Sequence, residues 1–329
     1  MPSSMTHTYF GIDVFEKLAP KYQVKIMHQL EYFKLFSQGS DPFMFYHFLI
    51  GSKAKQSSKI QKQMHQSKTQ NFFINTIQYI HQHHLTENEE IMAYLYGYIC
   101  HYFLDLYTHP LIYYKSGIFH KEDKNTYKYN ALHQEIEYMI DLYLIKEKET
   151  IKPEKFKTYK EIFQVKSFSP TLKNMINQTI KKTYQIPNIA NQYLKSIWYM
   201  KKCFRYINYD PHGIKLKLYK QIDKLSPANM IRLQELSYYN ITSKEASTYL
   251  NLDHKEWCYP WNKNQKFTTS FLDLYNQAKK DAINTIQEVT DLLEEKKLNI
   301  PKLKQLFPNL SFLTGRPCQE KLTFQYFEF

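Results

Sequence analysis

Glycine is scarce in this chain: only 7 of the 329 residues are glycine, and no segment of convincing length alternates apolar and polar residues. β-Sandwiches and β-barrels are built from many short alternating strands joined by turn residues, so the sequence argues against both. Hydrophobic residues make up 43% of the chain, and their spacing is helical nearly throughout. We predict an all-α protein, long enough for one large domain or two.

Cysteine shows no pattern. The four cysteines, Cys100, Cys203, Cys258 and Cys318, have no CxxC spacing. They give neither a disulfide framework nor a zinc-ribbon signal, which is typical of a reducing compartment. The chain start has no basic segment followed by an apolar stretch, and no window approaches the roughly 20 apolar residues of a membrane span. We therefore expect a cytoplasmic protein with no signal peptide or transmembrane segment.

Net positive charge is absent from the first half. Residues 1–150 contain 15 Lys, no Arg and 15 acidic residues, so the whole excess of +13 lies in residues 151–329, with 29 basic and 16 acidic residues. By contrast, 11 of the 13 histidines lie in residues 1–150. The Lys- and Glu-rich segment 148–168 is the candidate boundary between a site-bearing helical domain, 1–150, and a basic helical region, 151–329, packed on it. The basic region could attract phosphorylated substrates or an anionic membrane surface, or its lysines could simply be solvated.

Apolar periodicity and end signals predict the helices. Thr86 and Glu89 form a capping-box pattern, Pro110 should end its helix at about His109, and Ser169 with Pro170 is typical of a helix start. Gly39–Pro42 is typical of a turn between helices. We predict helices near residues 13–34, 57–83, 89–109, 130–147, 170–184, 190–206, 213–222, 228–237 and 268–296.

Metal-ligating side chains recur at helical spacing in the first half. His101, Asp105 and His109 follow one another at intervals of four and so share one helical stripe. Since the two histidines are about 12 Å apart along the helix axis, they cannot bind one ion but suit two metals with Asp105 between them. His133 and Glu137 on the next helix could complete the second site. The alternative is that these are ordinary buried polar residues.

Further candidates lie upstream. Asp41 is in a turn before Pro42, where a carboxylate is often only a turn-former, and His65 is a lone histidine on a predicted helix. His7 is close to the chain start, where a disordered tail is the usual expectation. The cluster of His81, His83 and His84 could take up metal adventitiously, without a catalytic role.

These residues also carry a resemblance to a known family. The matching pieces come in this order over residues 1–145: Thr6-His7-Thr-Tyr-Phe10, Gly39-Ser-Asp41-Pro42, Met64-His65, Gly97-Tyr-Ile-Cys-His101-Tyr-Phe-Leu-Asp105 with His109-Pro110, and His133-Gln-Glu-Ile-Glu137 followed by Asp141. The ordered set resembles the zinc-dependent phospholipase C family, all-α trinuclear zinc phosphoesterases related in fold to secreted single-strand nucleases.

The resemblance implies a multi-helix bundle and a set of zinc ligands. One zinc would be surrounded by Asp41, His65, His101 and Asp105. A second would be held by His109, His133 and Glu137. His7 and the bridging Asp105 would hold a third, for which the relatives also use an N-terminal tryptophan, whereas the first tryptophan here is Trp198. We therefore expect two zinc ions and leave the third open.

The resemblance also implies an activity. The protein would be a zinc-dependent phosphoric ester hydrolase that cleaves a phosphodiester or phosphomonoester, phospholipid foremost, with a metal-activated water that Asp41 orients or deprotonates. A nuclease or nucleotidase of the same fold is a second possibility, although a basic motif interleaved with aromatics for stacking bases is not evident. A metal-stabilised binding protein without turnover is a third. The sequence gives no indication of oligomeric state.

Overall fold

The computed structural model describes residues 4–47, 51–120, 122–227, 232–234, 237 and 243–328. Helices dominate these ranges, and the one sheet within them has two antiparallel strands, which confirms the predicted all-α class. The elements of the first half are α1 (Ser4–Lys17), α2 (Pro20–Gln23), α3 (Leu30–Phe36), the 3-10 helix η1 (Asp41–Phe45), α4 (Gly51–Gln66), α5 (Thr69–Gln82), α6 (Glu89–Ser116), η2 (Lys124–Tyr129) and α7 (Leu132–Lys148).

The second half continues with short and long helices around a small hairpin. Its elements are η3 (Pro153–Lys155), α8 (Thr158–Glu161), α9 (Pro170–Tyr184), α10 (Ile189–Cys203), the π-helix η4 (Phe204–Asn208), α11 (Ile214–Leu225), α12 (Ser243–Leu250), β1 (Trp257–Tyr259), β2 (Asn262–Phe267), α13 (Phe271–Glu294) and α14 (Ile300–Leu306).

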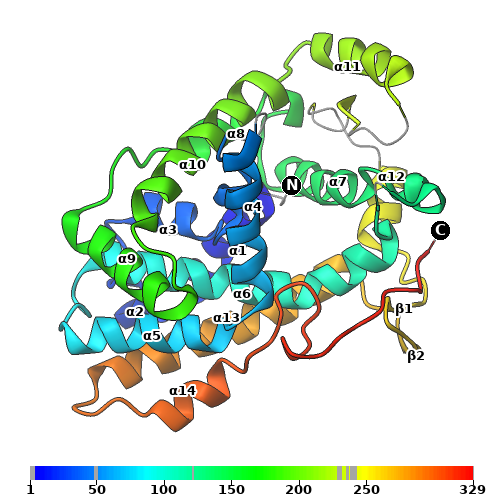
Figure 1. Cartoon of the computed structure of the whole chain (residues 1–329). Coiled ribbons are helices and arrows are strands. Elements are labelled where there is room, and N and C mark those ends of the chain that lie inside the picture. Colours follow the sequence, from blue (N-terminus) through cyan, green and yellow to red (C-terminus); the bar gives the residue numbers. More distant parts are fainter. Residues whose placement is uncertain are drawn as a thin grey trace.

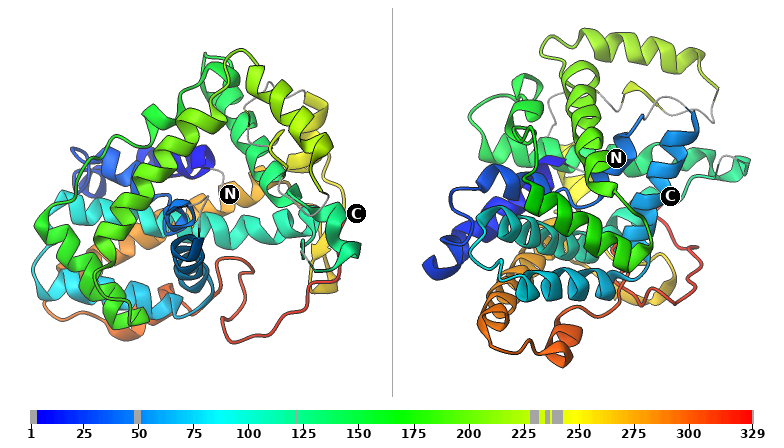
Figure 2. Two further views of the ribbon diagram at one scale, coloured as in Figure 1. Left: turned by 45° about the horizontal axis from the view of Figure 1, so that its top comes forward. Right: turned by 60° about the vertical axis from the view of Figure 1, so that its left-hand side comes forward.

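The long helix α6 forms the centre of the molecule (Figure 1). Every residue from Ile91 to Asp105 on it is buried, because α1, α3, α7 and α13 pack around it. A helix that is apolar on all sides needs such a complete cover. Gly97 permits the closest of these approaches: a Cβ atom there would lie 2.6 Å from the backbone carbonyl carbon of Phe36. Two further views show α6 running through the molecule with other helices around it (Figure 2).

The start and the end of α6 both correct the sequence predictions. The helix is capped by Asn88, whose side chain accepts a hydrogen bond from the Ile91 N–H at 3.2 Å, and not by a Thr86–Glu89 capping box. Nor does Pro110 end the helix at His109, since α6 continues to Ser116. Leu111 and Ile112 beyond the proline are buried in the core, and this packing outweighs the local preference.

Of the other helix predictions, two are wrong in their bounds and one helix start is confirmed. The prediction for 13–34 is wrong, because Pro20 begins a separate short helix, and that for 57–83 is wrong because Lys68 has a left-handed conformation, with φ of +53°, between α4 and α5. Ser169 does cap α9, accepting from the Leu172 N–H at 3.1 Å. Most of the predicted helix 228–237 lies outside the described residues.

Both halves of the chain contribute to the packing around α6. Helix α13, from the second half, packs along α6 with Ala278, Ala282 and Ile286 buried. Within the described ranges, no helix is both long and apolar enough to cross a membrane. The division of the chain at residue 150 stays a prediction.

Candidate metal centre

The structure brings all eight predicted site residues together. They come from α1, η1, α4, α6 and α7 and form three groups in which the ligand atoms lie within 4.8 Å of one another: His7, His101 and Asp105; Asp41, His65 and His101; His109, His133 and Glu137. The first two groups share His101, and we call their members the inner group. The third is the outer group. That these residues hold metal stays a prediction, which the geometry below supports.

The inner group is packed around His101. Its Nε2 lies 3.2 Å from Nε2 of His65, and its Nδ1 lies 3.3 Å from Nδ1 of His7. Asp41 approaches from η1, with Oδ1 at 3.2 Å from Nε2 of His65. All of these side chains are buried, so nitrogen and carboxylate oxygen atoms converge with little exposure to solvent.

Asp105 lies between the two groups, as the helical stripe predicts. Its Oδ2 is 3.3 Å from Nε2 of His101 and 3.4 Å from Nε2 of His65. Its Oδ1 is 3.3 Å from Nε2 of His7 and 3.7 Å from Nδ1 of His109. One carboxylate thus faces imidazoles from three helices.

The outer group joins α6 to α7. Glu137 Oε1 lies 3.2 Å from Nε2 of His133 and 3.5 Å from Nε2 of His109. The His133 side chain is 29% exposed, whereas those of His109 and Glu137 are buried. The outer group therefore lies nearer to solvent than the inner group.

Two buried carboxylate oxygens argue that these groups fit a cation. Among the described residues, Oδ2 of Asp41 accepts no hydrogen bond, and Oδ2 of Asp105 accepts none of good geometry, although imidazole nitrogens lie 3.3 and 3.4 Å from it. Buried carboxylates ordinarily satisfy their oxygens with donors or coordinate a metal. A set of imidazole nitrogens and carboxylate oxygens is the donor chemistry of zinc, and so the residues present fit that ion.

Three histidines are oriented by oxygen atoms behind them. Nδ1 of His65 donates to the carbonyl of Gln61 at 3.0 Å, and Nδ1 of His109 lies 3.1 Å from the carbonyl of Phe312. Nδ1 of His133 lies 3.3 Å from the Ser116 hydroxyl. In each case the other nitrogen, Nε2, faces a carboxylate of its group. Outer hydrogen bonds of this kind fix the tautomer and ring orientation of metal-ligating histidines.

Charge is distributed unequally over the histidines. Burial lowers the pKa of His101 to about 4, so this imidazole is neutral. Burial also opposes the charged forms of His65 and His109, but nearby carboxylates outweigh it. Asp105 and Asp41 raise the pKa of His65 to about 10, and Asp105 and Glu137 raise that of His109 to about 9. Without metal, protons on these two histidines offset the buried carboxylates.

The carboxylates respond in the opposite sense. Burial raises the pKa of Asp105, but the facing histidines, His109 first, hold it well below the usual range. Asp41 behaves likewise: burial opposes ionisation, and His101 and His65 more than offset that effect, so that its pKa is lowered. Both groups are therefore ionised and able to accept a cation.

The Gly39 turn places Asp41 and supports two histidines. Gly39 has φ of +52°, and a Cβ atom there would lie 2.1 Å from Cδ2 of His101. The next residue, Ser40, has its hydroxyl 3.0 Å from Nδ1 of His65, and Gln61 donates to Oδ1 of Asp41 at 3.0 Å. The turn predicted from Gly39–Pro42 is therefore part of the site, and glycine is required there both by its conformation and by the imidazole.

Asp141 has a positioning function that its place in the motif did not reveal. It follows His133 and Glu137 on α7 at the same interval of four, yet it points to α1, where it accepts the N–H groups of Met5 and Thr6 at 3.1 and 2.7 Å. The Thr6 hydroxyl also donates to it at 2.7 Å. Burial raises the pKa of Asp141 to about 7, against these hydrogen bonds. Asp141 thereby fixes the first turn of the helix that carries His7.

The C-terminal segment packs against two of the site histidines, a contact that the sequence did not predict. Besides its carbonyl contact to His109, Phe312 packs its ring edge-on against His65, with ring centroids 5.2 Å apart, and its N–H donates to the carbonyl of His65. Gly315 lies against the backbone carbonyl of Leu106. This carbonyl lacks its usual helical hydrogen bond, because Pro110, four residues later, has no N–H to donate. Spacing along the chain could not reveal these contacts, because more than 200 residues separate Phe312 from His109.

A pocket of about 340 Å³ opens onto both groups. Its lining includes Asp41, His65, His109, His133 and Glu137, together with Lys62, Gln61 and Tyr113. A second pocket of about 320 Å³ shares Gln66, Tyr113 and Leu313 with it and continues along Ile118, Leu322 and Phe324. The candidate metal centre is thus accessible from one side, and its pocket adjoins a groove of mixed polar and apolar lining.

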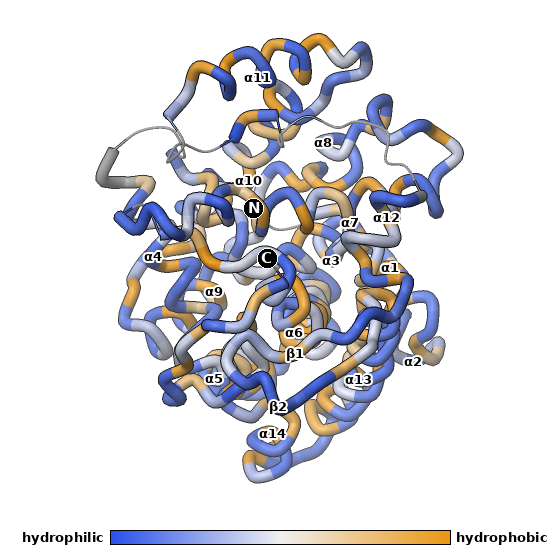
Figure 3. Tube along the Cα trace, turned by 90° about the vertical axis from the view of Figure 1, so that its right-hand side faces the viewer, coloured by the Kyte–Doolittle hydropathy of each residue, from blue (hydrophilic) through white to orange (hydrophobic). Residues whose placement is uncertain are grey.

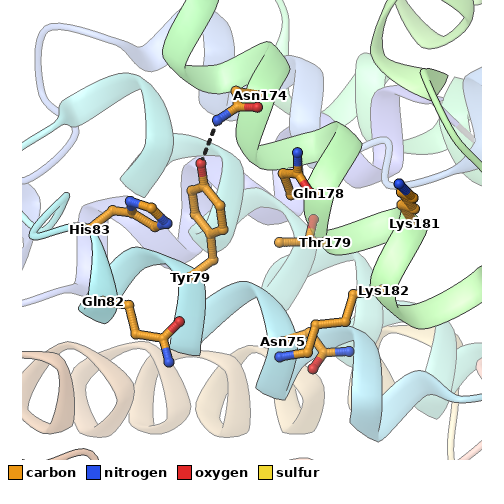
Figure 4. Close-up of a pocket in the computed structure, with 9 residues that line it drawn as sticks. All are labelled: Asn75, Tyr79, Gln82, His83, Asn174, Gln178, Thr179, Lys181 and Lys182. Carbon is orange, nitrogen blue, oxygen red and sulfur yellow. Dashed lines mark hydrogen bonds between the residues drawn. The ribbon is translucent and has the colours of Figure 1, made fainter.

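A larger pocket lies elsewhere. With a volume of about 570 Å³, it lies between α5 and α9 and is lined by polar residues, among them Tyr79, His83, Asn174 and Lys182 (Figure 4). The Asn174 amide donates to the Tyr79 hydroxyl at 2.8 Å. No metal-ligand group of described residues lies there. The candidate chemistry therefore belongs to the smaller pocket.

Comparison with known proteins gives one match. The model of a family described as zinc dependent phospholipase C matches residues 6–189, more than half of the chain. This range contains all eight residues of the two groups and Asp141, but not Phe312. No curated protein and no solved structure matches the chain.

Proposed function

We propose that this chain, which belongs to the zinc-dependent phospholipase C family, hydrolyses a phosphate ester with water activated by zinc. The observation that carries the proposal is the Asp105 carboxylate, which faces both ligand groups and has one buried oxygen that accepts no hydrogen bond of good geometry among the described residues. Asp41, His65, His101 and Asp105 would hold one ion and His109, His133 and Glu137 another, while His7 with Asp105 offers a third position. Bound zinc would lower the pKa of its water and offset charge on the phosphoryl oxygens.

The protein's own residues would orient the water and attract the substrate. Asp41 lines the pocket, is held by the Gln61 amide at 3.0 Å, and has a pKa lowered by His101 and His65 in spite of burial. An ionised carboxylate in this position accepts a hydrogen bond from the attacking water and so orients it. Lys62 at the pocket wall supplies positive charge for the anionic substrate.

The two adjoining pockets favour a phospholipid over a nucleotide. About 340 Å³ suits the phosphate and its headgroup. The adjoining groove has Ile118, Leu322 and Phe324 in its lining, side chains that suit the apolar part of a lipid. Stacking of a base would need aromatic faces beside basic residues. A phosphodiester of an apolar alcohol is therefore the proposed substrate.

Side-by-side hydrolysis assays test this proposal. The zinc-reconstituted chain, the chelated chain and an Asp41→Asn variant would each be given a nitrophenyl phosphorylcholine, a mononucleotide and single-stranded DNA. We expect zinc-dependent cleavage of the first and at least about a 100-fold loss in the variant.

Other results would point to other functions. Cleavage of only the nucleotide or the DNA would assign the site to a nuclease or nucleotidase. Zinc retained in stoichiometric amounts, with no turnover of any substrate, would indicate a metal-stabilised binding protein. Either result would overturn the proposal for phospholipid hydrolysis.

A further inference from the structure

We propose that α11 is a membrane-binding helix that inserts an outward-facing apolar stripe into the surface of an anionic phospholipid bilayer. The stripe is formed by Ile214, Leu218, Ile222 and Leu225. These side chains are among the most exposed large hydrophobic residues of the described chain, at 68%, 56%, 37% and 88% exposure. Their spacing of four, four and three residues places them on one side of the helix.

The opposite side of α11 faces the protein with the buried Asp223 and the half-buried Leu216 and Tyr219. The two carboxylate oxygens of Asp223 accept the N–H groups of Leu233 and Gln234, each at 2.8 Å. Asp210 accepts the N–H of Leu216 at 2.8 Å and the Ser237 hydroxyl at 2.8 Å. Helices of water-soluble proteins ordinarily bury their apolar side. These hydrogen bonds fix α11 with a second apolar stripe, Ile214 to Leu225, turned outward.

Lysines beside the stripe give the surface its charge. Lys217, Lys220 and Lys224 are exposed on α11, and Lys215 is turned to the carbonyls of Tyr206 and Tyr209, at 2.8 and 2.7 Å. A short amphipathic helix with lysines flanking an apolar stripe is typical of binding in the plane of a membrane interface. Each lysine near an anionic surface adds electrostatic attraction that salt screens.

Exposed aromatic residues lie on the elements that precede α11. Trp198 on α10 and Tyr206 in η4 are 50% and 59% exposed, and cations lie over both rings: Lys202 at 3.6 Å from the Trp198 centroid and Arg205 at 5.2 Å from that of Tyr206. Tryptophan and tyrosine with neighbouring cations favour the headgroup region of a bilayer. These elements therefore add to the same kind of surface.

A bilayer fits this surface better than a second copy of the chain. Two copies joined through α11 would bring the lysines of one helix to those of the other, with like-charge repulsion. Four side chains of one helix also give much less area than the roughly 800 Å² that each partner buries in a stable complex. Helix α11 lies at the top edge of the molecule, with hydrophobic and hydrophilic residues alternating along it (Figure 3).

This inference does not depend on the hydrolase activity, because α11 lies outside the metal centre and outside the matched residues 6–189. It would, however, bring the proposed enzyme to a lipid surface. The two proposals can fail separately: vesicle binding tests α11, and hydrolysis of a soluble nitrophenyl phosphate ester tests the metal centre.

Vesicle sedimentation provides the test. The full zinc-reconstituted chain would be mixed with vesicles of phosphatidylcholine alone or with 30% phosphatidylserine at low salt. We expect binding to the anionic vesicles that weakens with salt, and about a tenfold or greater loss in the double variant Leu218→Asn/Ile222→Asn. The matched control is Val24→Asn/Met27→Asn, which removes two apolar side chains of 51% and 47% exposure elsewhere on the surface.

Two further measurements keep the test decisive. Circular dichroism, zinc content and hydrolysis of the soluble ester should be unchanged in the α11 variant, so that lost binding is not lost folding. A triple variant Lys217→Glu/Lys220→Glu/Lys224→Glu should remove the preference for phosphatidylserine. Absence of vesicle binding, equal loss in the control variant, or a concentration-dependent dimer abolished by the α11 variant would each overturn the inference.

Discussion

The inner and outer groups of the metal centre differ in how far the fold encloses them. The inner residues come from four elements, α1, η1, α4 and α6, and all of them are buried. The outer residues come from α6 and α7, line the pocket and include the partly exposed His133. An enclosed metal site contributes to folding, whereas a site with an accessible position can serve catalysis. We infer that loss of the inner group costs stability as well as turnover, whereas loss of the outer group mainly costs turnover.

Removing Asp105, the inner-group carboxylate that also faces His109 of the outer group, should have the largest effect. An Asp105→Ala variant leaves His7, His65 and His101 without their facing carboxylate, and we expect zinc loss from both groups and at least a 100-fold fall in hydrolysis. Metal analysis and steady-state kinetics would measure this. The control is Asp291→Ala, which removes a carboxylate that pairs with Lys21 at the surface. Full zinc content with unchanged turnover would contradict the bridging position of Asp105.

A change at Gly39 should break the inner group alone. In a Gly39→Ala variant the added methyl group meets His101 at 2.1 Å and the residue keeps an unfavourable φ. Gly213→Ala is a matched control, with φ of +66° but nothing within 4 Å of the added Cβ. The control should cost about 1 kcal/mol of unfolding free energy, and the Gly39 variant clearly more, with loss of zinc. Equal denaturation midpoints would show that the contact with His101 is unimportant.

Histidine-to-alanine variants compare the two groups directly. His133 is 29% exposed, so His133→Ala should change the unfolding free energy of the metal-free chain by about 0.5 kcal/mol or less. His101→Ala removes a fully buried ring and should cost roughly 2 kcal/mol or more. Both variants should lose most of their hydrolytic activity. If His133→Ala were as destabilising as His101→Ala, the inferred difference in stability between the inner and the outer group would be wrong.

The smallest expected effect is a release of protons. The folded pKa values of His65 and His109, about 10 and 9, exceed the unfolded value of about 6.5. Their stabilising effect on the metal-free chain is therefore fully present below pH 6.5 and is lost as the pH rises through 9 to 10. Zinc ligation needs neutral imidazoles, so binding at pH 7 should release about two protons.

Calorimetry in buffers of different ionisation enthalpy would count these protons. The number should fall towards zero near pH 10, and the stabilisation by zinc should increase from pH 7 to pH 9. A proton count that does not change with pH would contradict the raised pKa values of His65 and His109.

Local spacing predicted the helical class, the stripe of His101, Asp105 and His109, and the positions of α6 and α7. It missed the helix that carries His7, which the sequence placed in a disordered tail, and it merged α4 with α5. It failed where contacts between distant parts of the chain determine the structure. The burial of Leu111 and Ile112 carries α6 through Pro110, and the local preference of a proline does not contain that information. The contacts of Phe312 and the turning of Asp141 towards α1 depend on tertiary packing, for which periodicity gives no signal.

The hydrogen bonds between Asp141 and the first turn of α1 have a consequence for biosynthesis. During synthesis His7 emerges before the other candidate ligands, but its helical turn lacks the Asp141 carboxylate until 135 further residues have been translated. Phe312, which faces His109 and His65, follows more than 200 residues after His109. Nascent chains that still lack Asp141 or Phe312 would therefore retain zinc weakly.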